Sequence, residues 1–263
     1  MTVIPAADTA TGVLGAVFLG WELWIWAAVV AACAVAGVVR GFTGFGFPLI
    51  VVTSTSLVVA PAEIVPIALL LDIQAGVRML PSVRYDVDRR GVSLLTLGAI
   101  PAIPLGAWLL ASLDPESMRL AIGVMVLIAV LVIARGYRMT RPPAPPLLAG
   151  TGVAAGLLSG SMGMPGPPVI LLYLSSPLPV ATLRATSVAF FLVTDIVALA
   201  ALLWFGLIDA SVGWRALVLV PVVELSVLAG RRLYGVTDPA HVKRAAMALL
   251  TVLAVIAIAK SVM

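Results

Sequence analysis

Apolar segments alternate with short polar connections along the whole chain, and none of the apolar segments shows the strict alternation of a surface strand. The stretches 120–134 and 245–259 contain no charged residue. About 20 apolar residues in a helix cross a hydrocarbon core of roughly 30 Å, and backbone groups in lipid must pair within their own helix. The pattern therefore predicts apolar helical segments near 12–41, 48–60, 62–80, 91–112, 117–135, 147–163, 167–177, 180–208, 211–230 and 243–262.

Two of these segments, 48–60 and 167–177, are too short to cross a membrane. At about 1.5 Å per residue they reach roughly 16–20 Å. Each follows a stretch rich in glycine and proline, "GFTGFGFPLI" in the first case and "GSMGMPGPPVI" in the second. Each short segment is therefore predicted to form a hairpin or a broken helix with the segment before it. Non-helical backbone at that depth must be buried in protein or line a cavity.

The two interruptions belong to a longer internal similarity. Matching residues recur at a nearly constant separation, and the pairs are Gly37 and Gly156, Gly41 and Gly160, Gly44 and Gly163, Gly46 and Gly166, Pro48 and Pro168, Asp72 and Asp195, Pro101 and Pro221, and Asp114 and Asp238. The basic, proline-rich stretch "RGYRMTRPPAPP" separates the two halves. We therefore predict a duplicated fold, with a first repeat over 1–140, which includes an N-terminal span, and a second repeat over 141–263.

Basic residues predict the orientation of the chain. Most of the sixteen Lys and Arg residues lie in loops 78–90, 135–146 and 231–244, whereas connections 112–118 and 207–214 contain none. The positive-inside rule makes the three basic loops cytoplasmic. Matched segments then cross the membrane in opposite directions. This predicts two inverted-topology repeats whose broken helices meet near the midplane, where such transporters bind substrate.

The interruptions also predict the chemistry of that site. A helix N-terminus carries about half a positive charge and free N–H donors, which favour anions, and proline is tolerated there. Two such ends facing each other would bind an anion without fixed charge. Glycines farther from the breaks, such as Gly37 and Gly152, also suit simple close packing of helices. The residues predicted to bind substrate are Arg40, Thr43, Gly44, Phe45, Gly46, Pro48, Ser161, Gly163, Met164, Gly166 and Pro168.

Three charged residues fall deep in predicted spans, where charge is costly and is usually paired or functional. Arg40 precedes the first glycine stretch, and Ser159 takes its place in the second repeat. Arg40 either faces the cavity and holds the anion or extends to the inner headgroups. Asp72 and Asp195 occupy matched positions. They are candidates for proton coupling, and the alternative is a structural pairing with an arginine or a helix end.

Composition excludes several classes of protein. The chain is 62% hydrophobic and 11% charged, whereas soluble domains carry about 25% charged residues. The net charge of +4 lies in short loops, so a nucleic-acid partner is not expected. Cys33 and His241 are the single cysteine and histidine, and they provide neither a disulfide nor a metal site. Ser161 in "SGSMG" has no histidine base in any span, so we expect no enzyme and no cofactor.

The two glycine-rich stretches, "AGVVRGFTGFGFPLI" and "AGLLSGSMGMPGPPVILLYL", resemble the paired signatures of the TauE/SafE sulfite exporter family. The "LRATS" at 183–187 and the Asp-Pro pair before the last helix of each half fit the same pattern. The resemblance implies two inverted repeats and the outward movement of sulfite, thiosulfate, sulfoacetate or another small sulfur or carboxylate anion. The second signature departs from the family's adjacent glycines at Met164 to Pro167.

Together these observations predict an all-α polytopic protein of the cell inner membrane that acts as a secondary transporter of a small anion. Its substrate is expected to be sulfite, an organosulfonate or a related oxyanion, exported by alternating access. An anion channel and a membrane scaffold or assembly protein that transports nothing are the alternatives. Its partners are the anion and the lipid bilayer, and the glycine-spaced faces would also suit a homo-oligomer.

Overall fold

The computed structural model describes residues 21–134 and 139–234, and this part of the chain is helical without strands. Its helices are α2 (Leu23–Thr43), α3 (Phe47–Thr55), α4 (Pro61–Val83), α5 (Arg89–Ser112), α6 (Pro115–Ala134), α7 (Pro145–Met162), α8 (Gly166–Ser175), α9 (Val180–Trp204) and α10 (Ala210–Tyr234). Each corresponds to a predicted apolar segment. The predicted segment 243–262, together with His241 and the second Asp-Pro pair, lies outside the described residues.

Five of these helices, α2, α4, α5, α9 and α10, are long and apolar enough to cross a membrane. Large apolar side chains on their outer faces are exposed, with Leu97 69% and Leu225 70% accessible. Exposed leucines at that density suit contact with lipid rather than water. The prediction of a multi-pass helical membrane protein is therefore confirmed.

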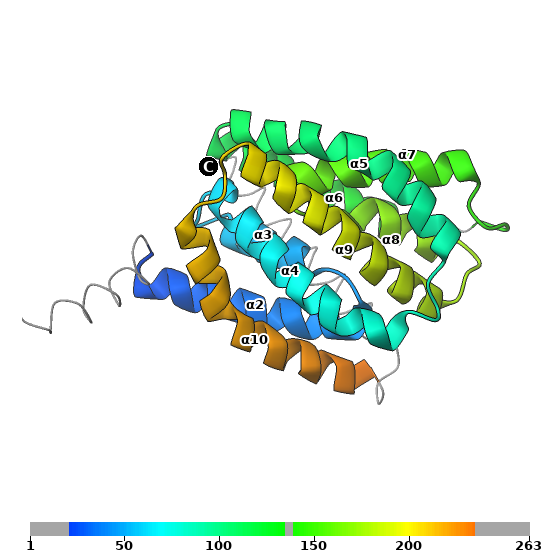
Figure 1. The fold of residues 1–263 in the computed structure, drawn as a ribbon, viewed down its shortest axis with the longest axis horizontal. Coiled ribbons are helices and arrows are strands. Elements are labelled where there is room, and N and C mark those ends of the chain that lie inside the picture. The colour runs from blue at the N-terminus through cyan, green and yellow to red at the C-terminus, as the bar shows by residue number, and fades with distance from the viewer. Residues whose placement is uncertain (1–20, 135–138, 235–263) are drawn as a thin grey trace, which may run out of the picture.

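The helices pack as two outer pairs around a central pair (Figure 1). Helices α5 and α7 lie side by side along one edge, and α2 and α10 lie side by side along the opposite edge. Between them, α4 packs against α9. The central pair carries both aspartates singled out from the sequence, Asp72 on α4 and Asp195 on α9.

Glycines allow the outer pairs to pack closely. A side chain at Gly152, Gly156 or Gly160 of α7 would collide with backbone carbonyl groups of α5. On the opposite edge, a side chain at Gly37 or Gly41 of α2 would collide with α10. The packing interpretation of these outer glycines is confirmed, because the neighbouring helix fills the space a side chain would take, with backbone at most of these positions and with the Ser226 side chain at Gly37.

Glycines near the breaks have a different role, because they adopt left-handed backbone conformations. Helix α2 ends at Gly44 (φ 83°), and Gly46 (φ 93°) precedes α3. Helix α7 ends at Gly163 (φ 66°) before α8 begins. Both short helices carry proline in their first turn, as the sequence predicted. The interruptions are real, and α3 and α8 contain only 9 and 10 residues.

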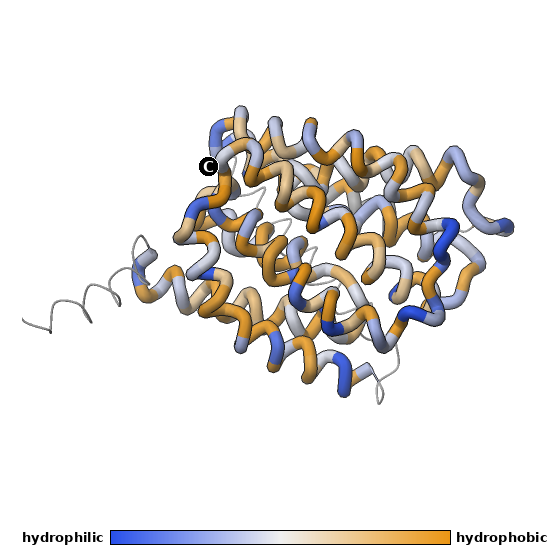
Figure 2. Tube along the Cα trace, in the orientation of Figure 1, coloured by the Kyte–Doolittle hydropathy of each residue, from blue (hydrophilic) through white to orange (hydrophobic). Residues whose placement is uncertain are grey.

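Hydrophilic residues gather at the two ends of the helical bundle (Figure 2). One end holds the connection between α4 and α5, the start of α7 and the end of α10, and it is the basic end (Figures 1 and 2). Its arginines include Arg84, Arg89, Arg90, Arg141, Arg231 and Arg232. The opposite end holds the connections between α5 and α6 and between α9 and α10, with Asp114, Glu116 and Asp209. The described parts of the three basic loops, 78–90, 139–146 and 231–234, therefore lie at the same end of the bundle, as predicted.

Candidate functional site

A charged cluster lies inside the bundle where α2, α4 and α9 meet. Arg40, Asp72 and Asp195 are 0%, 1% and 0% exposed. Arg40 Nε lies 2.9 Å from Asp72 Oδ1, and the two aspartates interact with each other and with Arg40. The two carboxylates that the sequence matched between repeats therefore share one site, and one guanidinium faces both.

Arg40 is directed into the protein and does not extend to the headgroups. One of its terminal nitrogens donates to the carbonyl oxygen of Gly44. The guanidinium carbon lies 5.6 Å from the centre of the Phe191 ring. The other terminal nitrogen makes no hydrogen bond to any described residue. A buried cation with an unused donor is rare in proteins, because burial of an unpaired donor costs free energy.

The first turn, between α2 and α3, is held together by its own groups. Thr43 Oγ1 donates to the carbonyl of Val39 (2.8 Å) and accepts from the backbone N–H of Phe45 (3.2 Å). The Thr43 hydroxyl thus closes the turn. Gly44, Gly46 and Pro48 are buried and Phe45 is half-buried. Their predicted contact with substrate stays a prediction.

The second turn, between α7 and α8, is also enclosed by side chains. Gly163 faces Val65 and Leu69 of α4, and Gly166 faces Phe191 of α9. Met164 and Ser161 are buried, and Ser161 Oγ donates to a carbonyl of its own helix (2.7 Å). Phe191 therefore contacts the second turn and also Arg40 beside the first turn. The two turns are linked through this ring.

The first turn contacts the far half of the chain in the same manner. The Arg184 side chain of α9 packs onto Gly44. Each turn therefore contacts the central helix that belongs to the other half of the sequence: the first meets α9 and the second meets α4. This reciprocal arrangement places both breaks around the α4–α9 pair that carries the two aspartates.

Three buried hydroxyl groups extend the polar character of this interior. Thr53, Ser159 and Ser187 are fully buried, and their hydroxyls have no hydrogen-bond partner among the described residues. Buried polar atoms of this kind usually bind water or a ligand. Ser187 is a residue that sequence reasoning did not assign, although it lies in the "LRATS" stretch. Its burial on a central helix is what distinguishes it.

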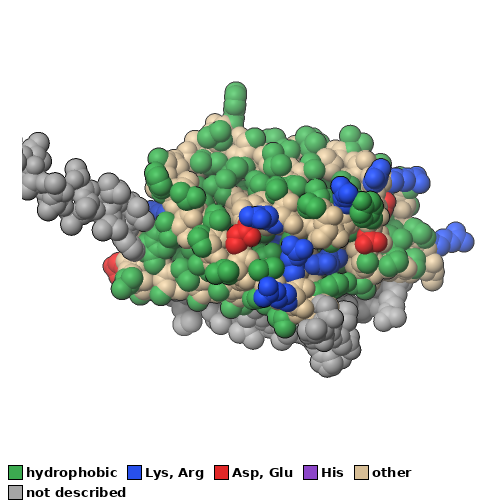
Figure 3. Space-filling model, turned by 60° about the horizontal axis from the view of Figure 1, so that its bottom comes forward, with side chains coloured by type: hydrophobic (Ala, Val, Ile, Leu, Met, Phe, Trp, Pro, Cys, Tyr) green, Lys and Arg blue, Asp and Glu red, His purple; other side chains and the backbone are tan. Residues whose placement is uncertain are grey.

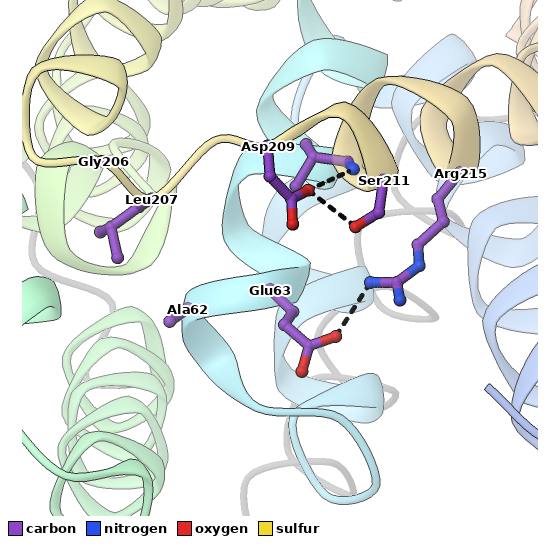
Figure 4. Close-up of a pocket in the computed structure, with 8 residues that line it drawn as sticks. Ala62, Glu63, Gly206, Leu207, Asp209, Ser211 and Arg215 are labelled. Atoms are coloured by element: carbon purple, nitrogen blue, oxygen red, sulfur yellow. Dashed lines mark hydrogen bonds and ion pairs between the residues drawn. The ribbon is translucent and has the colours of Figure 1, made fainter. Parts of the chain in front are cut away.

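A cavity of about 430 Å³ lies at the end opposite the basic loops (Figure 4). Its lining residues are Ala62, Glu63, Gly206, Leu207, Asp209, Ser211, Val212 and Arg215. Arg215 donates to Glu63 Oε2 at 2.9 Å, as Figure 4 shows. The Asp209 carboxylate accepts from the Ser211 hydroxyl (2.7 Å) and the Val212 N–H (3.0 Å). These bonds lower the pKa of Asp209. Sequence reasoning assigned neither Glu63 nor Arg215 to a functional site.

The basic end is held together by hydrogen bonds at the corresponding place. Asp88 precedes α5 as Asp209 precedes α10, and it caps its helix by accepting from the Gly91 N–H (2.9 Å). The Tyr173 hydroxyl of α8 donates to the other Asp88 oxygen (3.0 Å). The Asp88 N–H donates to the hydroxyl of Thr186 on α9 (3.0 Å). Three elements are therefore tied together at the basic end, whereas the opposite end holds the cavity.

Comparison with known proteins gives this architecture a family. The model of the sulfite exporter TauE/SafE family matches residues 29–257. The chain belongs to this family. The matched range includes both glycine-rich turns, the Arg40 cluster and the "LRATS" stretch, so the resemblance found in the sequence is confirmed.

A curated relative agrees with the family match. The chain is 32% identical over 219 residues to the probable sulfite/organosulfonate exporter TauE of Cupriavidus necator, covering 79% of this chain and 84% of the relative. No solved structure matches the chain. TauE/SafE proteins form a transporter family, so the protein is a membrane transporter of the sulfur-anion class rather than a member of an enzyme family.

Proposed function

We propose that the protein exports sulfite, an organosulfonate or a related small sulfur or carboxylate oxyanion across the inner membrane by alternating access. The observation that carries the proposal is Arg40, a fully buried guanidinium beside a broken helix that keeps one terminal nitrogen without a partner among the described residues. Such a donor suits an oxyanion, because hydrogen bonds between ionised groups are the strongest available in a protein interior.

The proposed mechanism uses two inverted repeats, 1–140 and 141–263. The pairing of the helices supports this division: α5 packs along α7 as its counterpart α10 packs along α2. Each glycine turn also contacts the central helix of the other half. The basic loops would be cytoplasmic, because positively charged loops are retained on that side. Substrate would then bind between the repeats, among Arg40 and the residues of the two turns.

Asp72 and Asp195 would couple transport to protons. With one guanidinium facing two carboxylates, one carboxylate must hold a proton for the cluster to be neutral, and unbalanced charge is costly in this interior. An anion bound to Arg40 would add negative charge, which a second proton would compensate. The charged groups that face one another here are those of Arg40 from α2, Asp72 from α4 and Asp195 from α9, and Arg184 of α9 adds a further positive charge near Arg40.

The two ends of the bundle support alternating access. The bonds among Tyr173, Asp88 and Thr186 tie α5, α8 and α9 together at the basic end, and in the proposed cycle they would keep that end closed while the cavity occupies the opposite end. A transporter exposes its site to one side at a time, whereas a conducting channel is open at both. Release of an exported anion would use the cavity, and loading would need the basic end to open.

Transport of sulfite by the purified protein in proteoliposomes tests the proposal. We expect saturable flux in the wild type, loss of flux in Arg40→Ala, and partial retention with raised KM in Arg40→Lys, because lysine keeps the charge but not the planar fork. Asp195→Asn should remove the response to an imposed proton gradient. Arg84→Gln, at an exposed arginine of the basic end, is the matched control.

Four outcomes count against the proposal. Flux that does not saturate would indicate a channel, and no flux in the wild type would favour a scaffold. Wild-type KM in both Arg40 variants would remove Arg40 from the binding site. Flux in Asp195→Asn that still follows the proton gradient would end the coupling model.

A further inference from the structure

Arg184 lies at the basic end of α9 and contacts the first glycine turn directly. One of its terminal nitrogens donates to the carbonyl oxygen of Gly41 at 2.8 Å. Its side-chain stem packs against Gly44, and its guanidinium lies 4.3 Å from the centre of the Tyr234 ring. The residue therefore connects the end of α2 with α9 and α10.

Positive charge accumulates around this turn. Arg184 is subject to the charges of Arg40 and Arg231. Figure 3 shows that Lys and Arg side chains, with a few Asp and Glu side chains beside them, gather on one part of a largely hydrophobic face. Among the described residues, Arg40 forms an ion pair with Asp72, and neither Arg184 nor Arg231 has a carboxylate within ion-pair distance. Like charges repel most where burial keeps water from screening them, and of these arginines Arg40 is buried, Arg184 half-buried and Arg231 exposed. The arginines of this group therefore outnumber the carboxylates paired with them.

Protein groups compensate only part of that excess. The C-terminal end of α2 offers about half a negative charge from its free carbonyls, and Arg40 and Arg184 each donate to one of them, at Gly44 and Gly41. Arg184 Nε is nonetheless buried and has no hydrogen-bond partner among the described residues. An unpaired donor on a cation, beside two further cations, is the arrangement that an oxyanion satisfies.

We propose that Arg184 and Arg231 form a second anion site, on the cytoplasmic side of the first turn, that captures a small sulfur oxyanion before it reaches Arg40. Arg40 and Arg184 both contact Gly44, so the two sites are neighbours across a single turn. A dianion such as sulfite fits this site better than a monoanion, because two guanidinium groups face it. The inference rests on the proposed export function. It adds that Arg184 is the residue that first captures the oxyanion before transport.

Sulfite uptake into inside-out membrane vesicles tests this role, because it presents substrate to the basic end. We expect Arg184→Gln to raise the KM for sulfite by about tenfold or more, since a hydrogen bond to a charged group is lost. Arg184→Lys should lie between Arg184→Gln and the wild type. Arg84→Gln is the matched control, because Arg84 also stacks on a tyrosine, Tyr85, at 4.7 Å and at the same end of the bundle. It should keep the wild-type KM.

A second measurement separates binding from a structural role. In right-side-out vesicles, sulfite meets the opposite end, and Arg184→Gln should leave that KM unchanged. An equal rise in KM from both sides, or a loss of maximal rate at constant KM, would overturn the proposal. Arg184 would then have only a structural role, through its hydrogen bond to the end of α2. A wild-type KM from the inner side would also overturn it.

The failure of this inference is distinguishable from failure of the proposed function. If the wild type transports sulfite and Arg40→Lys raises the KM while Arg184→Gln does not, the export function stands and the second site is rejected. If the wild type shows no sulfite uptake, the export function itself is rejected, and the second site is rejected with it.

Discussion

Replacing Arg40 by methionine tests the energetic role of the buried charged cluster. Methionine keeps much of the apolar stem but removes the guanidinium that faces Asp72 at 2.9 Å and Asp195 nearby. Both carboxylates are buried, so neither can exchange Arg40 for water. The variant also removes the donor that binds the Gly44 carbonyl at the end of α2.

The structure allows the cost to be ranked against a second variant. Removing one partner of a buried ion pair costs about 3–5 kcal/mol. Asp72→Asn should cost less, about 1.5–3 kcal/mol, the size of one polar contact to a charged group, because it removes one carboxylate charge from the ion pair while Asp195 still faces Arg40. At roughly 2–4 °C per kcal/mol, the melting temperature should fall by about 6–20 °C in Arg40→Met and by about 3–12 °C in Asp72→Asn.

Thermal unfolding of the purified protein in detergent, followed by tryptophan fluorescence, measures both values. Arg84→Met at the exposed basic end is the control and should melt with the wild type. The double variant Arg40→Met/Asp72→Asn should recover part of the loss, because it leaves one carboxylate fewer without a cation. If Arg40→Met melts like the wild type, or if Asp72→Asn is the more damaging of the two, the reasoning is refuted.

Four further predictions concern packing, backbone and the two ends of the bundle. Gly156→Leu should lose about 1–3 kcal/mol or more through overpacking of α7 on α5, whereas Gly150→Leu, where a side chain meets nothing within 4 Å, should melt with the wild type. Gly44→Ala should cost about 1–2 kcal/mol in the same melting assay, because alanine is strained in the left-handed conformation observed there (φ 83°). Tyr173→Phe should loosen the basic end by about 0.5–1.5 kcal/mol, and faster hydrogen exchange in the connection between α4 and α5 would reveal it; unchanged exchange would contradict the proposed closure. The pKa of Asp209 is lowered, so the contribution of its carboxylate to folding stability is present above the ordinary aspartate pKa and is lost as pH falls through the lowered value. Asp209→Ala should therefore reduce the fall in melting temperature on the acid side. An unchanged dependence of melting temperature on pH would speak against this.

Local features could be predicted from the sequence because each depends on neighbouring residues. Apolar length predicts helices that cross a membrane, and glycine followed by proline predicts where α2 and α7 end and where α3 and α8 begin. The same local logic located the outer glycines, such as Gly156, at close helix crossings. The family resemblance rested on these same stretches, which is why it was visible without any structure.

The meeting of distant side chains was decided by the tertiary structure. The sequence matched Asp72 to Asp195 as equivalent positions, but equivalence in a repeat does not imply contact. They interact because α4 and α9 pack together in the centre, and Arg40 joins them because α2 ends beside α4. Arg184 and Arg215 gain their significance in the same way, from a turn and a carboxylate far away in the chain. Hydropathy and turn chemistry act over a few residues, whereas the pairing of buried charges depends on which helices become neighbours, and only the folded chain determines that.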